Sequence, residues 1–114
     1  MTDREMLELA AKAAGIDVVQ PLYTDDTYSV LRCIEIDDDG FKDWNPLTDD
    51  GDALRLAVTL EIQVLYSHFT GEAEAKWNRG NDRLTEYGPD DHDAATRRAI
   101  VRAAAEIGRS MSNG

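Results

Sequence analysis

The stretch that decides the fold is WNPLTDDGDALRLAV, residues 44–58, where a Trp-Asn-Pro turn leads through a run of aspartates into an apolar segment. Asn45 precedes a proline, which disfavours helical geometry at that residue, so a helix has to begin after it. Thr48 is placed to cap this helix, which we expect to extend through Leu60. Its buried stripe is predicted to contain Leu54, Ala57 and Val58, with Leu47 as a hydrophobic staple outside the cap.

The aspartates of this stretch have a structural explanation that needs no ligand. Asp49, Asp50 and Asp52 fall in the predicted first turn, where free N–H groups and the helix dipole favour each carboxylate by about 0.3–1 kcal/mol. Calcium binding is the alternative, but an EF-hand register that starts at Glu35 puts Pro46 at the twelfth position, where the motif needs a glutamate. The sequence therefore predicts a helix start here, and no metal site.

The global composition sets the class of protein. The chain has 114 residues, of which 42% are hydrophobic, and this size predicts a single domain over residues 1–114. No apolar run approaches the roughly 18 residues of a membrane helix, and the acidic N-terminus does not resemble a signal peptide. The lone Cys33 cannot form an internal disulfide, which favours a reducing, cytoplasmic location.

The charge is strongly negative. Lys and Arg total 12 against 23 Asp and Glu, which gives a formal net charge of −11. Direct binding to nucleic-acid phosphates needs a basic face and is not expected. The same charge allows salt-sensitive attraction to a basic protein surface. It is also common among acidic cytoplasmic proteins.

Two further helices are signalled at the ends of the chain. Thr2 and Glu5 make a capping box, and Gly15 gives a stop signal. The buried stripe of this first helix is predicted to contain Met6, Leu9, Ala10 and Ala13. An aspartate caps the last helix, which runs over residues 94–111 with its apolar stripe at Ile100, Ala103, Ala104, Ile107 and Met111.

The remaining segments predict strands. Residues 28–36 give the clearest one, residues 61–69 and 73–77 form a hairpin, and residues 84–87 hold a short extension. A ragged strand near residues 18–23 precedes them. The order α-β-(β)-α-β-β-α predicts three helices on a small, largely antiparallel sheet, an α/β/α sandwich. Helices on both faces of that sheet would bury the strand at 28–36.

The sequence holds few groups for catalysis or metal binding. His68, His92 and Cys33 are too few and too scattered to predict a transition-metal site, and no phosphate-binding loop or nucleophile motif is present. No cofactor is therefore expected. A small hydrolase that uses aspartates with His68 or His92 stays an alternative, and it would need a pocket holding one histidine beside two carboxylates.

Candidate partner contacts are two tryptophans and two acidic clusters. Tryptophan is enriched among the residues that dominate binding energy, although packing in the core is the more common role. The candidates are Trp44, Trp77, Asp37, Asp38, Asp39, Asp49 and Asp50.

Three segments carry a family resemblance: residues 1–16, residues 44–58 and residues 94–109. Together they resemble small phage and prophage proteins with the phage ABA sandwich domain. The resemblance implies an α/β/α sandwich and a phage origin. That family carries no assigned activity, so the resemblance implies no catalytic residues.

The sequence favours a non-enzymatic, phage-derived accessory protein that acts by contacting a host or phage protein in the cytoplasm. One alternative is an acidic mimic of nucleic acid that inhibits a host DNA-binding or defence protein. Such a mimic needs carboxylates aligned on one surface. A further alternative is a homodimer joined through the alanine-rich helix or an edge strand.

Overall fold

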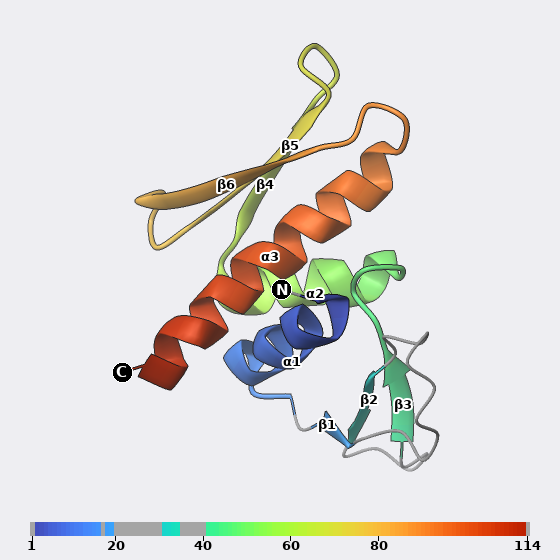
Figure 1. Ribbon diagram of the computed structural model, residues 1–114, viewed down its shortest axis with the longest axis vertical. Helices are drawn as coiled ribbons and strands as arrows, with labels where there is room; N and C mark the ends of the chain where they lie inside the picture. The colour runs from blue at the N-terminus through green and yellow to red at the C-terminus, as the bar shows by residue number, and fades with distance from the viewer. Residues whose placement is uncertain (1, 17, 20–30, 35–40, 114) are drawn as a thin grey trace.

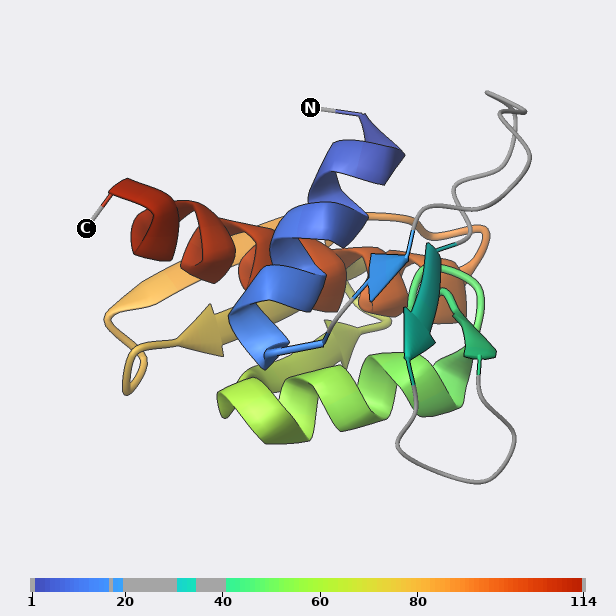
Figure 2. The same cartoon turned by 90° about the horizontal axis from the view of Figure 1, so that it is seen from below.

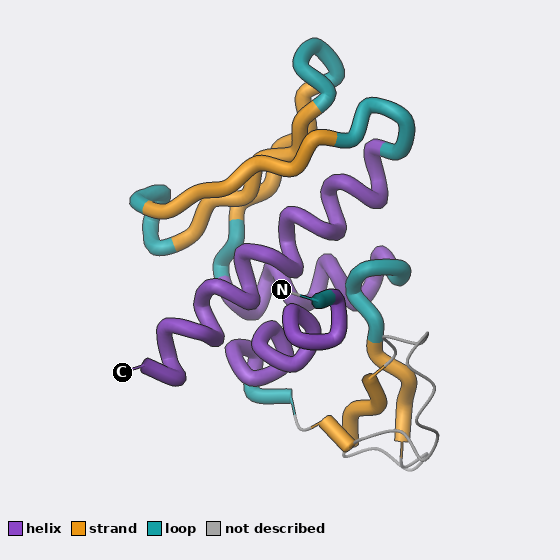
Figure 3. Tube along the Cα trace, in the orientation of Figure 1, coloured by secondary structure: helices purple, strands orange, loops and turns teal. Residues whose placement is uncertain are grey.

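The computed structural model describes residues 2–16, 18–19, 31–34 and 41–113 (Figure 1). Its elements in chain order are α1 (Asp3–Ala14), β1 (Val18–Val19), β2 (Leu31–Ile34), β3 (Phe41–Trp44), α2 (Asp50–Leu60), β4 (Gln63–Ser67), β5 (Glu72–Trp77), β6 (Asp82–Tyr87) and α3 (His92–Asn113). The strands form two antiparallel sheets, β1-β2-β3 and β4-β5-β6, with the helices between them (Figure 3). The predicted fold class, three helices packed with a small antiparallel sheet, is confirmed.

The ends of α1 follow the local sequence signals. The Thr2 Oγ1 accepts a hydrogen bond from the Glu5 N–H at 3.1 Å, and Gly15 adopts the left-handed conformation with φ 72°. Both predicted caps are therefore confirmed. The side that faces the core contains Met6, Leu7, Ala10 and Ala11, while the predicted Leu9 and Ala13 lie at its margin and are only partly buried.

The long helix α3 is the centre of the molecule, and both α1 and the sheet β4-β5-β6 pack against it (Figures 1 and 2). The Asp91 Oδ1 accepts from the Ala94 N–H at 3.0 Å, which confirms the expected aspartate cap. Ile100, Ala103 and Ala104 are buried as predicted, whereas Met111 is mostly exposed because it lies in the last turn.

The crossing of α1 and α3 depends on small residues. A Cβ atom at Gly108 would lie 2.1 Å from the Leu9 carbonyl oxygen, so only glycine allows this approach. Ala10, Ala11 and Ala104 are also fully or almost fully buried. The alanine-rich sequence therefore lets the two helix backbones pack closely.

The sheet β4-β5-β6 has one covered and one open face. Ala75 on β5 pairs with Val64 and Leu84 on its neighbours, and this row packs against the helical core. On the opposite face Leu65 and Tyr87 are largely exposed. β6 is a full strand over Asp82–Tyr87, so the predicted extension at 84–87 was too short.

The second sheet contains the strand that looked clearest in the sequence. Of residues 28–36, Leu31–Ile34 form β2, and the others lie outside the described residues. β2 pairs with β1 and with β3, a strand that the sequence did not predict. The strand predicted at 28–36 and the 61–77 hairpin thus belong to different sheets.

No helix in the described part of the chain is long and apolar enough to cross a membrane.

Candidate functional site

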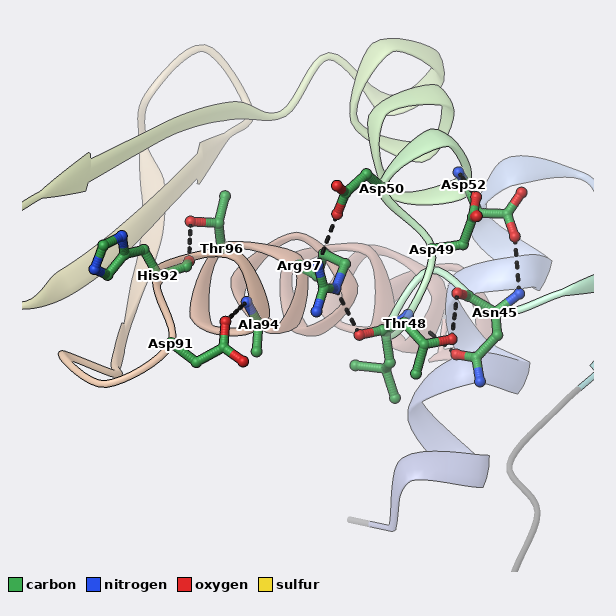
Figure 4. A network of polar contacts seen from close by, with 11 residues as sticks. Asn45, Thr48, Asp49, Asp50, Asp52, Asp91, His92, Ala94, Thr96 and Arg97 are labelled. Atoms are coloured by element: carbon green, nitrogen blue, oxygen red, sulfur yellow. Dashed lines mark hydrogen bonds and ion pairs between the residues drawn. The ribbon is translucent and has the colours of Figure 1, made fainter.

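The start of α2 is held by the Asn45 turn (Figure 4). The Asn45 carbonyl accepts from the N–H groups of Thr48 and Asp49, at 3.1 and 2.9 Å. Asp49 is the residue that caps α2, because its Oδ2 accepts from the Asp52 N–H at 2.8 Å. The prediction that Thr48 caps this helix was therefore wrong by one residue, and Thr48 belongs to the turn before the cap.

Asp52 has a different role from its neighbours, because its side chain is buried. Its Oδ2 accepts from the Asn45 N–H at 3.0 Å, and its Oδ1 accepts from the Arg55 Nη2 at 2.7 Å. The residue is only 6% exposed. A charge so close to the core is tolerated because both oxygens have partners. The carboxylate locks the turn onto the helix and so fixes which side of α2 faces inward.

Arg97 links α3 to the start of α2 (Figure 4). Its Nε donates to the Leu47 carbonyl at 2.8 Å, and its Nη1 contacts the Asp50 Oδ1 at 2.6 Å. The guanidinium is largely buried, whereas the Asp50 carboxylate is mostly exposed. The three aspartates thus act differently: Asp49 caps, Asp50 pairs with α3, and Asp52 holds the turn.

This anchoring exposes a face of α2 that was expected to be buried. Ala53, Leu56 and Ala57 point into the core, while Leu54 is 64% exposed and Val58 is 69% exposed. The predicted stripe was correct for Ala57 and wrong for Leu54 and Val58. Burial of Asp52 turns these two apolar side chains outward.

A groove of about 680 Å³ runs along this exposed face, between α2, β4 and the first turns of α3. Its apolar lining includes Leu54, Val58, Ile62, Val64, Tyr66 and Ile100. The groove forms because α2 turns directly into β4 through Glu61, which adopts a left-handed conformation with φ 56°. Ile62 then donates its N–H to the Ala57 carbonyl at 2.9 Å and closes the helix end.

The charged residues of the groove are mainly acidic. Asp50, Glu61 and Asp93 contribute three carboxylates to the lining, against one guanidinium from Arg97. That guanidinium already contacts Asp50 and the Leu47 carbonyl. A cationic group that entered the groove would therefore meet a negative site beside an apolar wall.

Two histidines that are far apart in the sequence meet at Tyr66, one of the groove's lining residues. The His68 and His92 ring centroids lie 4.8 Å apart, and each lies close to Tyr66, at 5.0 and 5.1 Å. The Tyr66 hydroxyl donates to the Gly88 carbonyl at 3.1 Å. This convergence was not predicted, because neither histidine stands in a recognisable motif.

The histidine cluster bears on the catalytic and metal-binding alternatives. Both histidines are exposed, and the nearby Asp91 carboxylate accepts a hydrogen bond as the cap of α3. Among the described residues, no group of three or more His, Cys, Asp or Glu side chains is arranged to hold a metal ion. The hydrolase interpretation gains a pair of close histidines, but of the two aspartates adjacent to His92 in the sequence, Asp91 is engaged as the cap of α3.

The other residues singled out in the sequence are spread over the molecule. Trp44 ends β3 and is 5% exposed, so it packs in the core, and Trp77 ends β5 and is partly buried. The strands of the two tryptophans lie in different sheets. Asp37, Asp38 and Asp39 lie outside the described residues. The groove itself was not predicted, because the sequence placed Leu54 and Val58 in the core.

Comparisons of this chain with protein-family models, with curated proteins and with solved structures gave no match.

Proposed function

We propose that this protein is a non-enzymatic interaction module that binds a segment of a partner protein in the groove between α2, β4 and α3. The observation that carries the proposal is the exposure of Leu54 and Val58 on a concave wall. Large apolar side chains that line a groove at the surface are typical of interaction sites. The phage origin implied by the resemblance remains part of this proposal.

The chemistry of the groove favours a partner segment that is both apolar and basic. Apolar side chains of the partner would cover Leu54 and Val58, and its Lys or Arg side chains would face Asp50, Glu61 and Asp93. A second copy of this chain is a poor occupant, because each copy carries a formal net charge of −11. The partner is thus expected to be a different, basic protein.

The nucleic-acid mimic receives less support from the described acidic residues. Asp49 and Asp52 accept hydrogen bonds within the start of α2, and Asp91 does the same at the start of α3. These carboxylates are arranged around helix ends and form no row of free charges. The apolar wall of the groove also has no counterpart in a phosphate backbone.

The proposal is tested by selecting binders from a displayed library of random peptides. The protein is immobilised, and peptides that do not bind are washed away. The groove variant carries Leu54→Glu and Val58→Glu, which leave the core intact because both side chains are exposed. The matched control is Met111→Glu, which is 53% exposed but lies in the last turn of α3, away from the groove. Circular dichroism and urea unfolding establish that all three proteins are equally folded.

The proposal predicts enriched peptides that combine apolar and basic residues. They should bind the wild type and the Met111→Glu variant with similar affinity, and bind the groove variant at least about tenfold more weakly, which corresponds to about 1.4 kcal/mol. The proposal fails if no peptide is enriched, or if the groove variant binds the enriched peptides as well as the control does.

A further inference from the structure

One edge of the groove is the unpaired edge of a sheet. Within the described strands, β4 (Gln63–Ser67) pairs only with β5, so its other edge is open. In an antiparallel sheet, alternate residues direct their N–H and C=O groups toward the neighbouring strand and away from it. β4 therefore presents backbone donors and acceptors along its open edge, beside the apolar wall that α2 provides.

The opposite edge of the same sheet is treated differently. Arg102 on α3 donates from Nη1 to the Thr85 carbonyl of β6 at 3.2 Å and also pairs with the Glu86 carboxylate. Arg98, one turn earlier, contacts the same carboxylate at 3.4 Å. Basic side chains thus contact the β6 edge, while the residues beside β4 are mainly apolar. Natural sheets protect edges with charge and cover, and β4 has apolar neighbours in place of such protection.

The side chains of β4 alternate between the two faces. Val64 and Tyr66 line the groove, while Leu65 lies on the open face of the sheet. A strand added beside β4 would alternate in the same way. One set of its side chains would lie over Leu54 and Val58, and the other set would point to the solvent-exposed face.

We infer, resting on the proposed function, that the groove binds its partner by β-strand addition to β4. The occupant is an extended segment of a basic protein in which apolar and basic residues alternate. Backbone hydrogen bonds along β4 would supply affinity, and the pockets for alternate side chains would supply specificity. The acids that line the groove, Asp50, Glu61 and Asp93, would attract the basic segment through the electrostatic field they create, without a paired contact to each basic side chain.

The inference is tested with a capped peptide of alternating arginine and valine as the probe. Two matched peptides carry backbone N-methyl groups on alternate residues, one on the arginines and one on the valines. A fourth peptide has the same composition, with the valines rearranged to helical spacing. Affinities for the wild type and for the Leu54→Glu/Val58→Glu variant are measured by fluorescence anisotropy, and amide hydrogen exchange of residues 63–67 is followed by NMR.

Strand addition predicts an asymmetric effect of N-methylation. One methylated peptide should lose about tenfold or more in affinity, because its edge-facing N–H groups are removed, and the other should bind nearly as well as the probe. The probe should also slow hydrogen exchange in β4. Binding by the helical-spacing peptide alone, or equal binding by both methylated peptides, would overturn strand addition and leave the groove as the binding site.

Complete lack of binding by the alternating probe would also overturn the inference. The proposed function is judged separately, by the library selection. If the peptides enriched there ignore the groove substitutions, the groove itself is the wrong site. The two failures are therefore distinguishable.

Discussion

Arg97 connects elements that are remote in the sequence, since its Nε binds the carbonyl of Leu47, 50 residues earlier. The contact joins the first turns of α3 to the start of α2 and so holds two walls of the groove together. A periodicity argument treats such an arginine as part of the polar face of a helix. Its role follows only from the three-dimensional arrangement, in which the guanidinium is largely buried.

Arg97→Ala is expected to lower the free energy of unfolding by about 1–3 kcal/mol, because it leaves the Leu47 carbonyl and Asp50 without their partner. The measurement is urea unfolding followed by circular dichroism. Arg109→Ala is the matched control, because Arg109 is exposed and contacts Glu106 on its own helix at 3.7 Å. That change should stay within about 0.5 kcal/mol. Equal effects of the two substitutions would show that Arg97 does not link the helices.

Gly108→Ala separates helix propensity from packing. Propensity alone predicts a gain of about 1 kcal/mol, because alanine is the better helix former. The Leu9 carbonyl oxygen, 2.1 Å from where the new Cβ would lie, predicts a loss of about 1–3 kcal/mol as the two helices are forced apart. Thermal unfolding of the variant decides between these signs. Ser110→Ala, at an exposed position of the same helix, serves as the control and should not destabilise the protein. A stabilised Gly108→Ala protein would contradict the close crossing of α1 and α3.

At the scale of elements, the ends of helices were predictable and their faces were less so. The caps at Thr2 and Gly15 depend on a few neighbouring residues, so the sequence indicates them directly. The prediction of which face of α2 points inward was wrong, because this short helix carries two apolar stripes and only one of them can face the core. The stripe of Ala53, Leu56 and Ala57 is buried, and Leu54 and Val58 are exposed. This follows because the Asn45 turn binds the Asp52 carboxylate and buries it.

The strands show a similar limit. β3 was missed because Phe41-Lys42-Asp43-Trp44 contains no β-branched residue, and its pairing with β2 supplies what local propensity does not. β6 was predicted too short because Asp82 and Arg83 look like loop residues. They are paired with Trp77 and Lys76 of β5, so the hairpin extends the strand beyond its apolar part.

The cap of α2 gives a test at this scale. Asp49→Ala should lower the free energy of unfolding by about 1 kcal/mol, because it removes the acceptor for the Asp52 N–H. Thr48→Ala should have a smaller effect, because the Thr48 hydroxyl is exposed and lies 3.4 Å from the Asn45 carbonyl. Chemical unfolding of the two variants in parallel is sufficient. A larger loss of unfolding free energy for Thr48→Ala than for Asp49→Ala would indicate that Thr48 caps α2, as the sequence predicted.

For the whole molecule, the fold class followed from the order of helices and strands, whereas the groove did not. Its walls come from three elements, and two of its wall residues, Leu54 and Val58, were expected in the core. The meeting of His68 and His92 at Tyr66 is likewise a product of tertiary structure. One sequence indicates the local preferences that build each element, but it does not show which faces the packing leaves uncovered.

The net charge leads to a prediction for binding at this scale. Affinity of the alternating arginine–valine peptide should fall as salt is raised from low to physiological and higher concentrations, because screening weakens attraction by the acidic residues. Glu61→Gln, at the groove, should reduce this salt dependence more than Glu106→Gln, on an exposed turn of α3 outside the groove. Fluorescence anisotropy at graded salt gives both slopes. Identical slopes for the two variants would show that the acidic residues of the groove do not attract the peptide.

The central claim is that the groove between α2, β4 and α3 is the binding surface, and amide chemical-shift mapping with the arginine–valine peptide tests it most directly. The account predicts that the shifted resonances cluster in α2 around Leu54 and Val58, in residues 62–67, and in the first turns of α3. The open sheet face around Arg83 and Tyr87 should remain unchanged. Shifts concentrated on that open face, or spread evenly over the acidic surface, would contradict the claim.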